Sequence, residues 1–418
     1  MHFMRRLNAT REESGQILVL FAWWLPLLCL FVGFGIDFGF GFLTKAQLAK
    51  ACDAAALAAM RNLGQGQTQA TIIGKAEFAL NANVSSSMYV SAPVPSITYG
   101  SSGGEPVVNV TASAQIHTFF IGLAGFHTLT IADSSQATRP PIILSLVLDK
   151  SGSMNDNGGS TALPPSVTDF LGYFIGGTDR LGEVSFSDIA NSDVAISTSF
   201  KTPITNFVNG MSFGGATFAQ GGLMNANTEV TGVSNPPANA VQVVVFFTDG
   251  WANSIQSTVA GSQVNFGGCA PAEFAVGWCN GVSCWYNANG NSIGGTVVGN
   301  SNTAVTCDGQ NNFTATDTAP PDSLPNPASL TINNIADEAD YRAVQYANTM
   351  RAAGITVYAI GLGDKINQTY LQELANDPAS STYNANEPSG LAEFAPTASD
   401  LDTAFQTVAS KILLRLTN

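Results

Sequence analysis

Two mainly apolar runs in this sequence each end abruptly in an aspartate, and this pattern limits the folds that the chain can adopt. The first run begins at Leu144 and ends at Asp149, and the second begins at Val243 and ends at Asp249. Strands of a parallel sheet covered by helices read as continuous apolar runs, and ligands bind at their carboxyl ends. The sequence therefore predicts an α/β fold in which both aspartates lie at the same sheet edge.

Hydroxyl side chains accompany these aspartates. Ser151 and Ser153 follow Asp149 at alternate positions, and Thr217 ends a glycine-containing loop, residues 214–217, before a helix-like stretch. Mg²⁺ takes hard oxygen ligands in near-octahedral geometry and retains several waters. Hydroxyls supported by carboxylates suit such an ion and leave a coordination position open, so we predict a metal site here.

The order and spacing of these residues and their flanking strands resemble the metal-ion-dependent adhesion site (MIDAS) of von Willebrand factor A domains. The resemblance implies a Rossmann-like, mostly parallel sheet flanked by helices over residues 141–418. It also implies that a protein partner supplies an acidic side chain to the bound cation. The cation would be Mg²⁺, or else Mn²⁺ or Ca²⁺, and its ligands in this chain would be Asp149, Ser151, Ser153, Thr217 and Asp249. A Rossmann-like domain whose strand-end residues only form turns is the alternative.

The amino-terminal region predicts a single membrane span. Residues 17–36 contain no charge and are long enough to cross the hydrocarbon layer as a helix. A cleaved signal peptide is the alternative, although its apolar region is normally shorter and ends at a small-x-small cleavage site that is missing here. Strong helix formers continue to residue 63, so one helix is predicted over residues 17–63, after a cytoplasmic tail at residues 1–16.

Small residues near the end of this span predict close packing against another helix. They are Gly33, Gly35 and Gly39, and Asp37 lies among them. An aspartate at the membrane edge is expected either to be hydrated or to pair with a charge on a partner.

Charge and cysteine content predict an exported domain. The chain has 16 Lys and Arg against 30 Asp and Glu, and its net charge of −14 disfavours nucleic acid, which requires a basic surface. Four cysteines in one Asn- and Gly-rich stretch predict two disulfides of open connectivity: Cys269, Cys279, Cys284 and Cys307. Zinc is the alternative, without a Cys-x-x-Cys pair or a nearby histidine to favour it. The basic residues on the two sides of the span are too similar in number to decide its orientation. Disulfides form in an oxidising compartment, so the predicted disulfides place the amino terminus in the cytoplasm and most of the chain outside it.

A second resemblance covers the amino-terminal third. The blocks at residues 13–17, 35–39 and 47–59 resemble the amino-terminal region of TadG-like proteins of the Tad/Flp pilus assembly system, as do alternating strands around the apolar segment 119–125. The resemblance implies a pilin-like, strand-rich region at residues 64–140 and a place in the bacterial inner membrane, single-pass, with the bulk in the periplasm or at the cell surface. Type IV pilins are cut after a Gly and carry Glu at the fifth position after it, whereas Leu20 holds that position after Gly15. Cleavage after Gly15 is therefore not expected, and the apolar helix should stay in the chain as its membrane anchor.

The residues favour binding over catalysis. Only three histidines occur, and no Ser-His-Asp set, Cys-His pair or Walker loop can be assembled. Three roles stay open: an adhesin, a scaffold for pilus or envelope components, and a minor pilin. An insertion at about residues 251–335 leaves the sheet directly after Asp249. We expect this loop to set binding specificity, the alternative being a surface loop elsewhere on the rim.

Overall fold

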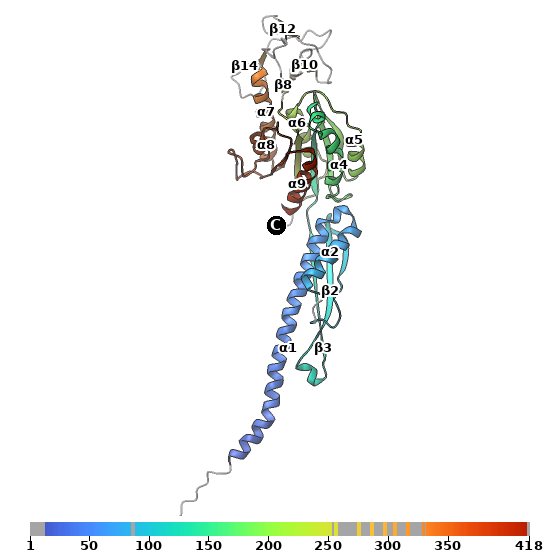
Figure 1. The fold of residues 1–418 in the computed structure, drawn as a ribbon, viewed down its shortest axis with the longest axis vertical. Helices are drawn as coiled ribbons and strands as arrows, with labels where there is room; N and C mark the ends of the chain where they lie inside the picture. Colours follow the sequence, from blue (N-terminus) through green and yellow to red (C-terminus); the bar gives the residue numbers. More distant parts are fainter. Residues whose placement is uncertain are drawn as a thin grey trace, which may run out of the picture. The chain divides into compact units, whose positions relative to one another are not determined.

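The computed structural model describes residues 13–84, 88–252 and 332–415, together with short strands between residues 255 and 330. It divides into two compact units (Figure 1). The first comprises Met1–Asn62, Gly66–Ser101 and Val107–Thr138, and the second Leu63–Gln65, Ser102–Pro106 and Arg139–Asn418.

The first unit is dominated by one long helix. Helix α1 (Glu13–Arg61) has 49 residues and contains Pro26. Its stretch Leu20–Arg61 is long and apolar enough to span a membrane. Large apolar side chains between Leu20 and Leu43 point outward around most of the helix, as in a helix surrounded by lipid.

The rest of this unit packs against the later turns of α1. Helix α2 (Gln67–Ala82) follows the short helix η1 (Leu63–Gln65), and a Cβ added to Gly74 would lie 3.2 Å from Ala59. The region had been predicted as strand-rich, and α2 was missed. Three of its four buried residues are Ala or Gly, so its helical period carries little apolar signal.

Three antiparallel strands complete the unit: β1 (Ser96–Ser102), β2 (Glu105–His117) and β3 (Thr128–Thr138), in the order β1-β2-β3. Val108, Val110 and Ala112 alternate along β2 and are all buried, so they form its inner face. Strand β3 runs along α1, and the β2–β3 connection contains the short helix η2 (Ile121–Ala124) (Figure 1).

The glycine-rich face of α1 contacts the β2–β3 connection with its short helix η2. Gly33 lies against Phe120 in the β2–β3 connection, whereas a Cβ on Gly35 or Gly39 would meet nothing within 4 Å. The Asp37 carboxylate is buried rather than hydrated, since the residue is only 2% exposed. It accepts hydrogen bonds from the backbone N–H groups of Phe119, Phe120 and Ile121 at 2.9, 2.8 and 2.7 Å. The expected hydration of Asp37 was therefore wrong, whereas pairing with a charge on a partner stays a prediction.

The second unit is built on a six-stranded sheet of order β16-β15-β7-β4-β5-β6, in which the edge strand β6 is the antiparallel one. Numbered along the chain, this order is 3-2-1-4-5-6, the doubly wound arrangement. The predicted α/β fold of the von Willebrand factor A type is confirmed. Its strands are β4 (Ile142–Asp149), β5 (Arg180–Phe186), β6 (Ala190–Ser197), β7 (Val241–Thr248), β15 (Thr356–Leu362) and β16 (Ala392–Ala395).

Helices cover both faces of this sheet. Alternate residues of β4 enter two separate cores, Ile143 and Val147 on one face and Leu144 and Leu146 on the other, which explains the mainly apolar run. The first face carries α6 (Ala219–Thr231), α7 (Ile332–Ala352) and α8 (Gln368–Ala375). The second carries α4 (Gly159–Leu171), α5 (Lys201–Asn209) and α9 (Leu401–Arg415), and a short α3 (Ser153–Asp156) follows β4.

Short antiparallel strands occupy the chain between β7 and α7. One sheet contains β8 (Ile255–Ser257), β9 (Phe274–Val276) and β10 (Trp285–Asn287), and two pairs follow, β11 (Thr296–Val298) with β12 (Ala304–Thr306) and β13 (Ala315–Asp317) with β14 (Ala328–Leu330). Cys269, Cys279, Cys284 and Cys307 lie outside the described residues, so their disulfides stay a prediction.

A buried carboxyl group on β5 yields a pH prediction. Among the residues that the structure describes, neither side-chain oxygen of Glu183 has a hydrogen-bond partner. Burial, followed by the nearby Asp193, raises the pKa of Glu183 well above its usual value. The folded state thus holds this proton at pH values where the unfolded chain has lost it, so stability falls as pH rises above about 4.5. Glu183→Gln should remove up to about 1.4 kcal/mol per pH unit from that slope.

Urea unfolding of the full chain in detergent between pH 5 and 8 measures this slope. The matched control is Glu373→Gln, since Glu373 is partly exposed on α8 and should leave the slope unchanged. An unaltered slope in Glu183→Gln would show that Glu183 is not the group responsible.

Candidate metal centre

Three loops at the carboxyl edge of the sheet are joined by backbone hydrogen bonds. The loop after β4 donates from Lys150 N to Phe186 O at 2.9 Å, at the end of β5. The same loop donates from Gly152 N to Gly215 O at 3.1 Å and accepts at Lys150 O from Gly214 N at 2.8 Å. These bonds fix the loop after β4 against the loop that precedes α6, at the end of the sheet where doubly wound folds bind ligands.

Both oxygens of Asp149 are held by donors. Ser151 N donates to Oδ1 at 2.7 Å, and the Thr248 hydroxyl at the end of β7 donates to Oδ2 at 2.6 Å. The carboxylate is completely buried, so these two bonds orient it rigidly.

Asp249 is connected to the same group through the serines. The Ser153 hydroxyl donates to Asp249 Oδ1 at 2.7 Å and lies 3.0 Å from the Ser151 hydroxyl. Asn157 donates from Nδ2 to Asp249 Oδ2 at 3.0 Å. Four of the five predicted ligands, Asp149, Ser151, Ser153 and Asp249, therefore form one hydrogen-bonded chain across two strands.

Thr217 lies on the loop that faces this chain of residues. The loop turns at Gly215, whose φ of +89° favours glycine, and a Cβ there would lie 2.6 Å from a carboxylate oxygen of Asp188. Asp188 also accepts a hydrogen bond from Ala216 N at 2.6 Å, directly before Thr217. The Thr217 side chain is only 4% exposed. Asp188 thus fixes the backbone that carries the fifth predicted ligand.

Three residues of the centre were missed from the sequence: Asn157, Asp188 and Thr248. Thr248 and Asp188 both lie at or just after the carboxyl end of a strand, which was a usable signal. Asn157 follows α3, and nothing in its spacing distinguishes it from the other asparagines of the chain.

The centre concentrates negative charge away from water. Burial and the neighbouring Asp249 carboxylate raise the pKa of Asp149 to about 7. Burial also raises the pKa of Asp249. The two carboxyl groups and the Ser151 and Ser153 hydroxyls form a hard oxygen donor set of the type that Mg²⁺ binds. Within the described ranges, no group of three or more His, Cys, Asp or Glu side chains is positioned for metal binding. The centre instead mixes hydroxyls with carboxylates.

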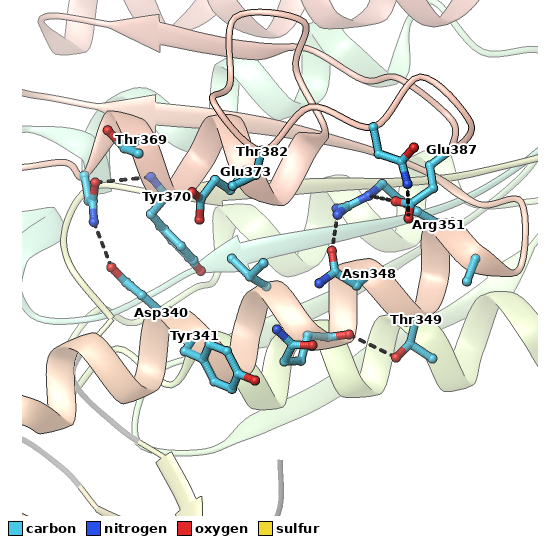
Figure 2. A pocket seen from close by; sticks show the side chains of 15 residues that line it. Asp340, Tyr341, Asn348, Thr349, Arg351, Thr369, Tyr370, Glu373, Thr382 and Glu387 are labelled. Atoms are coloured by element: carbon cyan, nitrogen blue, oxygen red, sulfur yellow. Dashed lines mark hydrogen bonds and ion pairs between the residues drawn. The ribbon is translucent and has the colours of Figure 1, made fainter. Parts of the chain in front are cut away.

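A separate cavity lies between α7 and α8, with a volume of about 830 Å³ (Figure 2). None of the five predicted ligands lines it. Its wall includes Asn367, which accepts a hydrogen bond from Tyr370 N at 3.2 Å and donates to Asp340 at 2.9 Å, so this side chain caps α8 and ties it to α7.

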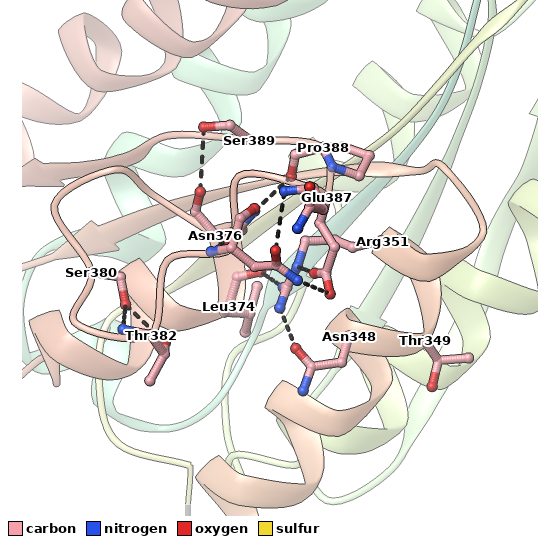
Figure 3. A network of polar contacts seen from close by, with 12 residues as sticks. Asn348, Thr349, Arg351, Leu374, Asn376, Ser380, Thr382, Glu387, Pro388 and Ser389 are labelled. Carbon is pink, nitrogen blue, oxygen red and sulfur yellow. Dashed lines mark hydrogen bonds and ion pairs between the residues drawn. The ribbon is translucent and has the colours of Figure 1, made fainter.

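One end of that cavity is closed by a polar network around Arg351 (Figure 3). Arg351 donates to Glu387 at 2.9 Å and to the Leu374 carbonyl at 2.6 Å. Asn384 donates to Glu387 at 2.9 Å, and Asn376 donates to the Asn384 carbonyl at 2.9 Å. These groups satisfy one another and hold the loop between α8 and β16, which is a structural role.

Comparison with known proteins finds one family match, which covers part of the amino-terminal region. Residues 15–62 match the model of the Tad family, described as "Putative Flp pilus-assembly TadE/G-like". No curated protein matches the sequence. Solved structures with similar folds include the pilus adhesin SpaC from Lactobacillus rhamnosus GG, with 16% identity, a TM-score of 0.42 and coverage of 78% of this chain but only 34% of SpaC.

Two further solved structures are similar at this level. The vWF domain of the type V pili tip protein Mfa5 from Porphyromonas gingivalis has 16% identity and a TM-score of 0.42, with 68% of this chain and 98% of that chain covered. Proximal thread matrix protein 1 from the mussel byssus, with a zinc-occupied MIDAS motif, has 14% identity and a TM-score of 0.38, with 66% and 46% covered. The fold assignment itself rests on the strand order of the sheet.

Proposed function

We propose that this chain is a membrane-anchored, extracytoplasmic component of a Tad/Flp-type pilus system that binds a protein partner through a metal-ion-dependent adhesion site. The observation that carries the proposal is the hydrogen-bonded chain Asp149–Ser151–Ser153–Asp249 at the carboxyl edge of the sheet. The carboxylates that follow β4 and β7 meet the hydroxyls of Ser151 and Ser153 there, and all of these residues except the half-buried Ser153 are buried.

Mg²⁺ is the proposed ion, and it supplies an electrophilic coordination position for an acidic side chain of the partner. Ser151, Ser153 and Thr217 would present hydroxyl oxygens to the ion, and Asp149 and Asp249 would balance its charge. Thr248 donates a hydrogen bond to Asp149 at 2.6 Å, and Asn157 donates one to Asp249 at 3.0 Å, so these two side chains orient the carboxylates. Such supporting contacts tune the affinity of metal sites.

The proposed anchor is α1. Its outward apolar surface and the family match at residues 15–62 support a single-pass protein of the bacterial inner membrane. We propose a cytoplasmic amino terminus, with the second unit in the periplasm or at the cell surface. An adhesin would bind outside the cell, whereas an assembly scaffold or a minor pilin would bind pilus or envelope components.

The partner test is affinity capture with the full chain in detergent, from envelope extracts and from host or matrix extracts. The amount of partner captured in the presence of Mg²⁺ should fall by at least about tenfold when chelator is added. It should fall as much when the Asp249→Ala variant is used, because both changes remove the coordination position. Asp169→Ala is the matched control, since Asp169 is exposed on α4. Equal retention with and without metal would refute coordination as the binding mechanism.

Protease access to intact cells then separates the roles. Removal of the second unit from outside supports an adhesin or an exposed pilin. Protection until the outer membrane is opened supports a scaffold confined to the envelope.

A further inference from the structure

The connection between β2 and β3 is an exposed apolar surface. Residues 118–126 contain no charged side chain. We call Phe119, Phe120, Leu123 and Phe126 the hairpin tip, and these side chains are 61, 39, 86 and 68% exposed. A cluster of three phenylalanines and a leucine in water is costly, at about 25 cal/mol per Å² of apolar surface. Something other than water is expected to cover it.

The hairpin tip contacts α1 over a short stretch of the helix, between Gly33 and Phe40. Asp37 binds three consecutive backbone N–H groups of the tip and is itself 2% exposed. One turn earlier, a Cβ on Gly33 would lie 2.4 Å from the Cβ of Phe120, so the helix and the tip are in close contact. The rings of Phe40 and Phe119 are 5.7 Å apart on the other side of Asp37. The tip is therefore held in a defined position along the helix.

The part of α1 that contacts the hairpin tip lies at the end of the uncharged run of this helix. Gly33 lies within residues 17–36, and Asp37 is the first charged residue after them. At 1.5 Å of rise per residue, the tip lies within about one helical turn of the end of the span. The exposed side chains of the tip continue the outward apolar surface formed by Phe34, Ile36 and Phe38.

We propose that the hairpin tip inserts into the interfacial region of the phospholipid bilayer, beside the membrane-spanning helix. The inference rests on the membrane anchor of the proposed function. The bilayer is the occupant because the tip continues the surface of the helix that the lipid would cover. Asp37 fits this location, since a carboxylate at membrane depth persists where its charge is satisfied, and three backbone donors satisfy it here.

Insertion of the tip gives the first unit two contacts with the membrane. A single span can tilt and rotate, and its orientation is set by neighbouring helices and interfacial anchors. An apolar tip fixed to α1 would hold one face of the helix toward the interface. The β2–β3 sheet would then have a fixed orientation on the membrane.

The test is photocrosslinking of the full chain reconstituted in vesicles of phosphatidylethanolamine and phosphatidylglycerol. A benzophenone amino acid replaces one residue at a time: Leu123 in the tip, Leu28 in the span, or Ile72 on α2. Ile72 is a matched control because it is 58% exposed and α2 packs on turns of α1 some 20 residues beyond the span. Phospholipid adducts are quantified by mass spectrometry.

We expect lipid adducts at Leu28 and Leu123, with the yield at Leu123 at least about tenfold above that at Ile72. A yield at Leu123 equal to that at Ile72, with Leu28 still labelled, would overturn tip insertion and leave the anchor intact. Adducts between two copies of the chain at Leu123 would also overturn it, by assigning the tip to a protein interface. Absence of lipid adducts at Leu28 would refute the anchor itself and thus the basis of the inference.

Discussion

Asp249→Ala will weaken Mg²⁺ and Mn²⁺ binding by at least about 100-fold, because it removes one of two carboxylates that balance the charge of the ion. The substitution also leaves the Ser153 hydroxyl and the Asn157 amide without the acceptors they now contact at 2.7 and 3.0 Å. Isothermal titration of the full chain in detergent with Mn²⁺ measures the loss. Electron paramagnetic resonance of bound Mn²⁺ gives an independent readout.

Two controls make this result specific. Asp169→Ala removes an exposed carboxylate of the same unit and should leave the affinity unchanged. Asn157→Ala keeps both predicted carboxylates and should weaken binding by only about 10-fold, as loss of a supporting contact usually does. Unchanged Mn²⁺ affinity in Asp249→Ala would mean that the ion, if bound, is held elsewhere.

Asp179→Ala is expected to destabilise the second unit by about 3–5 kcal/mol, because it leaves a buried charge without its partner. Arg139 contacts both Asp179 oxygens, at 2.9 and 2.5 Å, and the two side chains are 2% and 0% exposed. The same carboxylate accepts hydrogen bonds from Ile142 N at 3.0 Å and Ile175 N at 2.6 Å, so it also fixes the start of β4 and the turn before β5.

Urea unfolding monitored by hydrogen exchange of β4 and β5 measures this loss. The double variant Arg139→Met with Asp179→Leu separates charge from packing, because it removes both charges and keeps apolar volume. We expect it to recover a large part of the stability, since replacing a buried pair by apolar residues is often neutral or favourable. Equal destabilisation in the single and double variants would assign the effect to the lost backbone hydrogen bonds.

Strands β4 and β7 of the second unit were predictable because they are buried on both faces. In β4, neighbouring residues such as Leu146 and Val147 enter different cores, so nearly every position had to be apolar. The same reasoning located Asp149 and Asp249, where burial ends and polar side chains begin. Helix α2 was not predictable in this way, since the small residues Ala70 and Gly74 pack closely on α1 without a strong apolar period.

In the metal centre too, some residues could be predicted from local sequence spacing and others could not. Asp149, Ser151 and Ser153 are close in sequence, so their local spacing carried the prediction. Asp188 and Asn157 support the centre from other elements, and their contacts depend on how β5 and α3 lie against the loops.

The sequence by itself indicated strands β4 and β7, the long apolar helix and the five candidate ligands, because burial period and strand-end chemistry are local properties of the chain. Only the tertiary structure decided where Asp37 directs its charge. A carboxylate 37 residues from the amino terminus accepts three N–H groups more than 80 residues further along the chain. Contacts of such sequence separation depend on how α1 and the β2–β3 hairpin pack, and no local pattern encodes them.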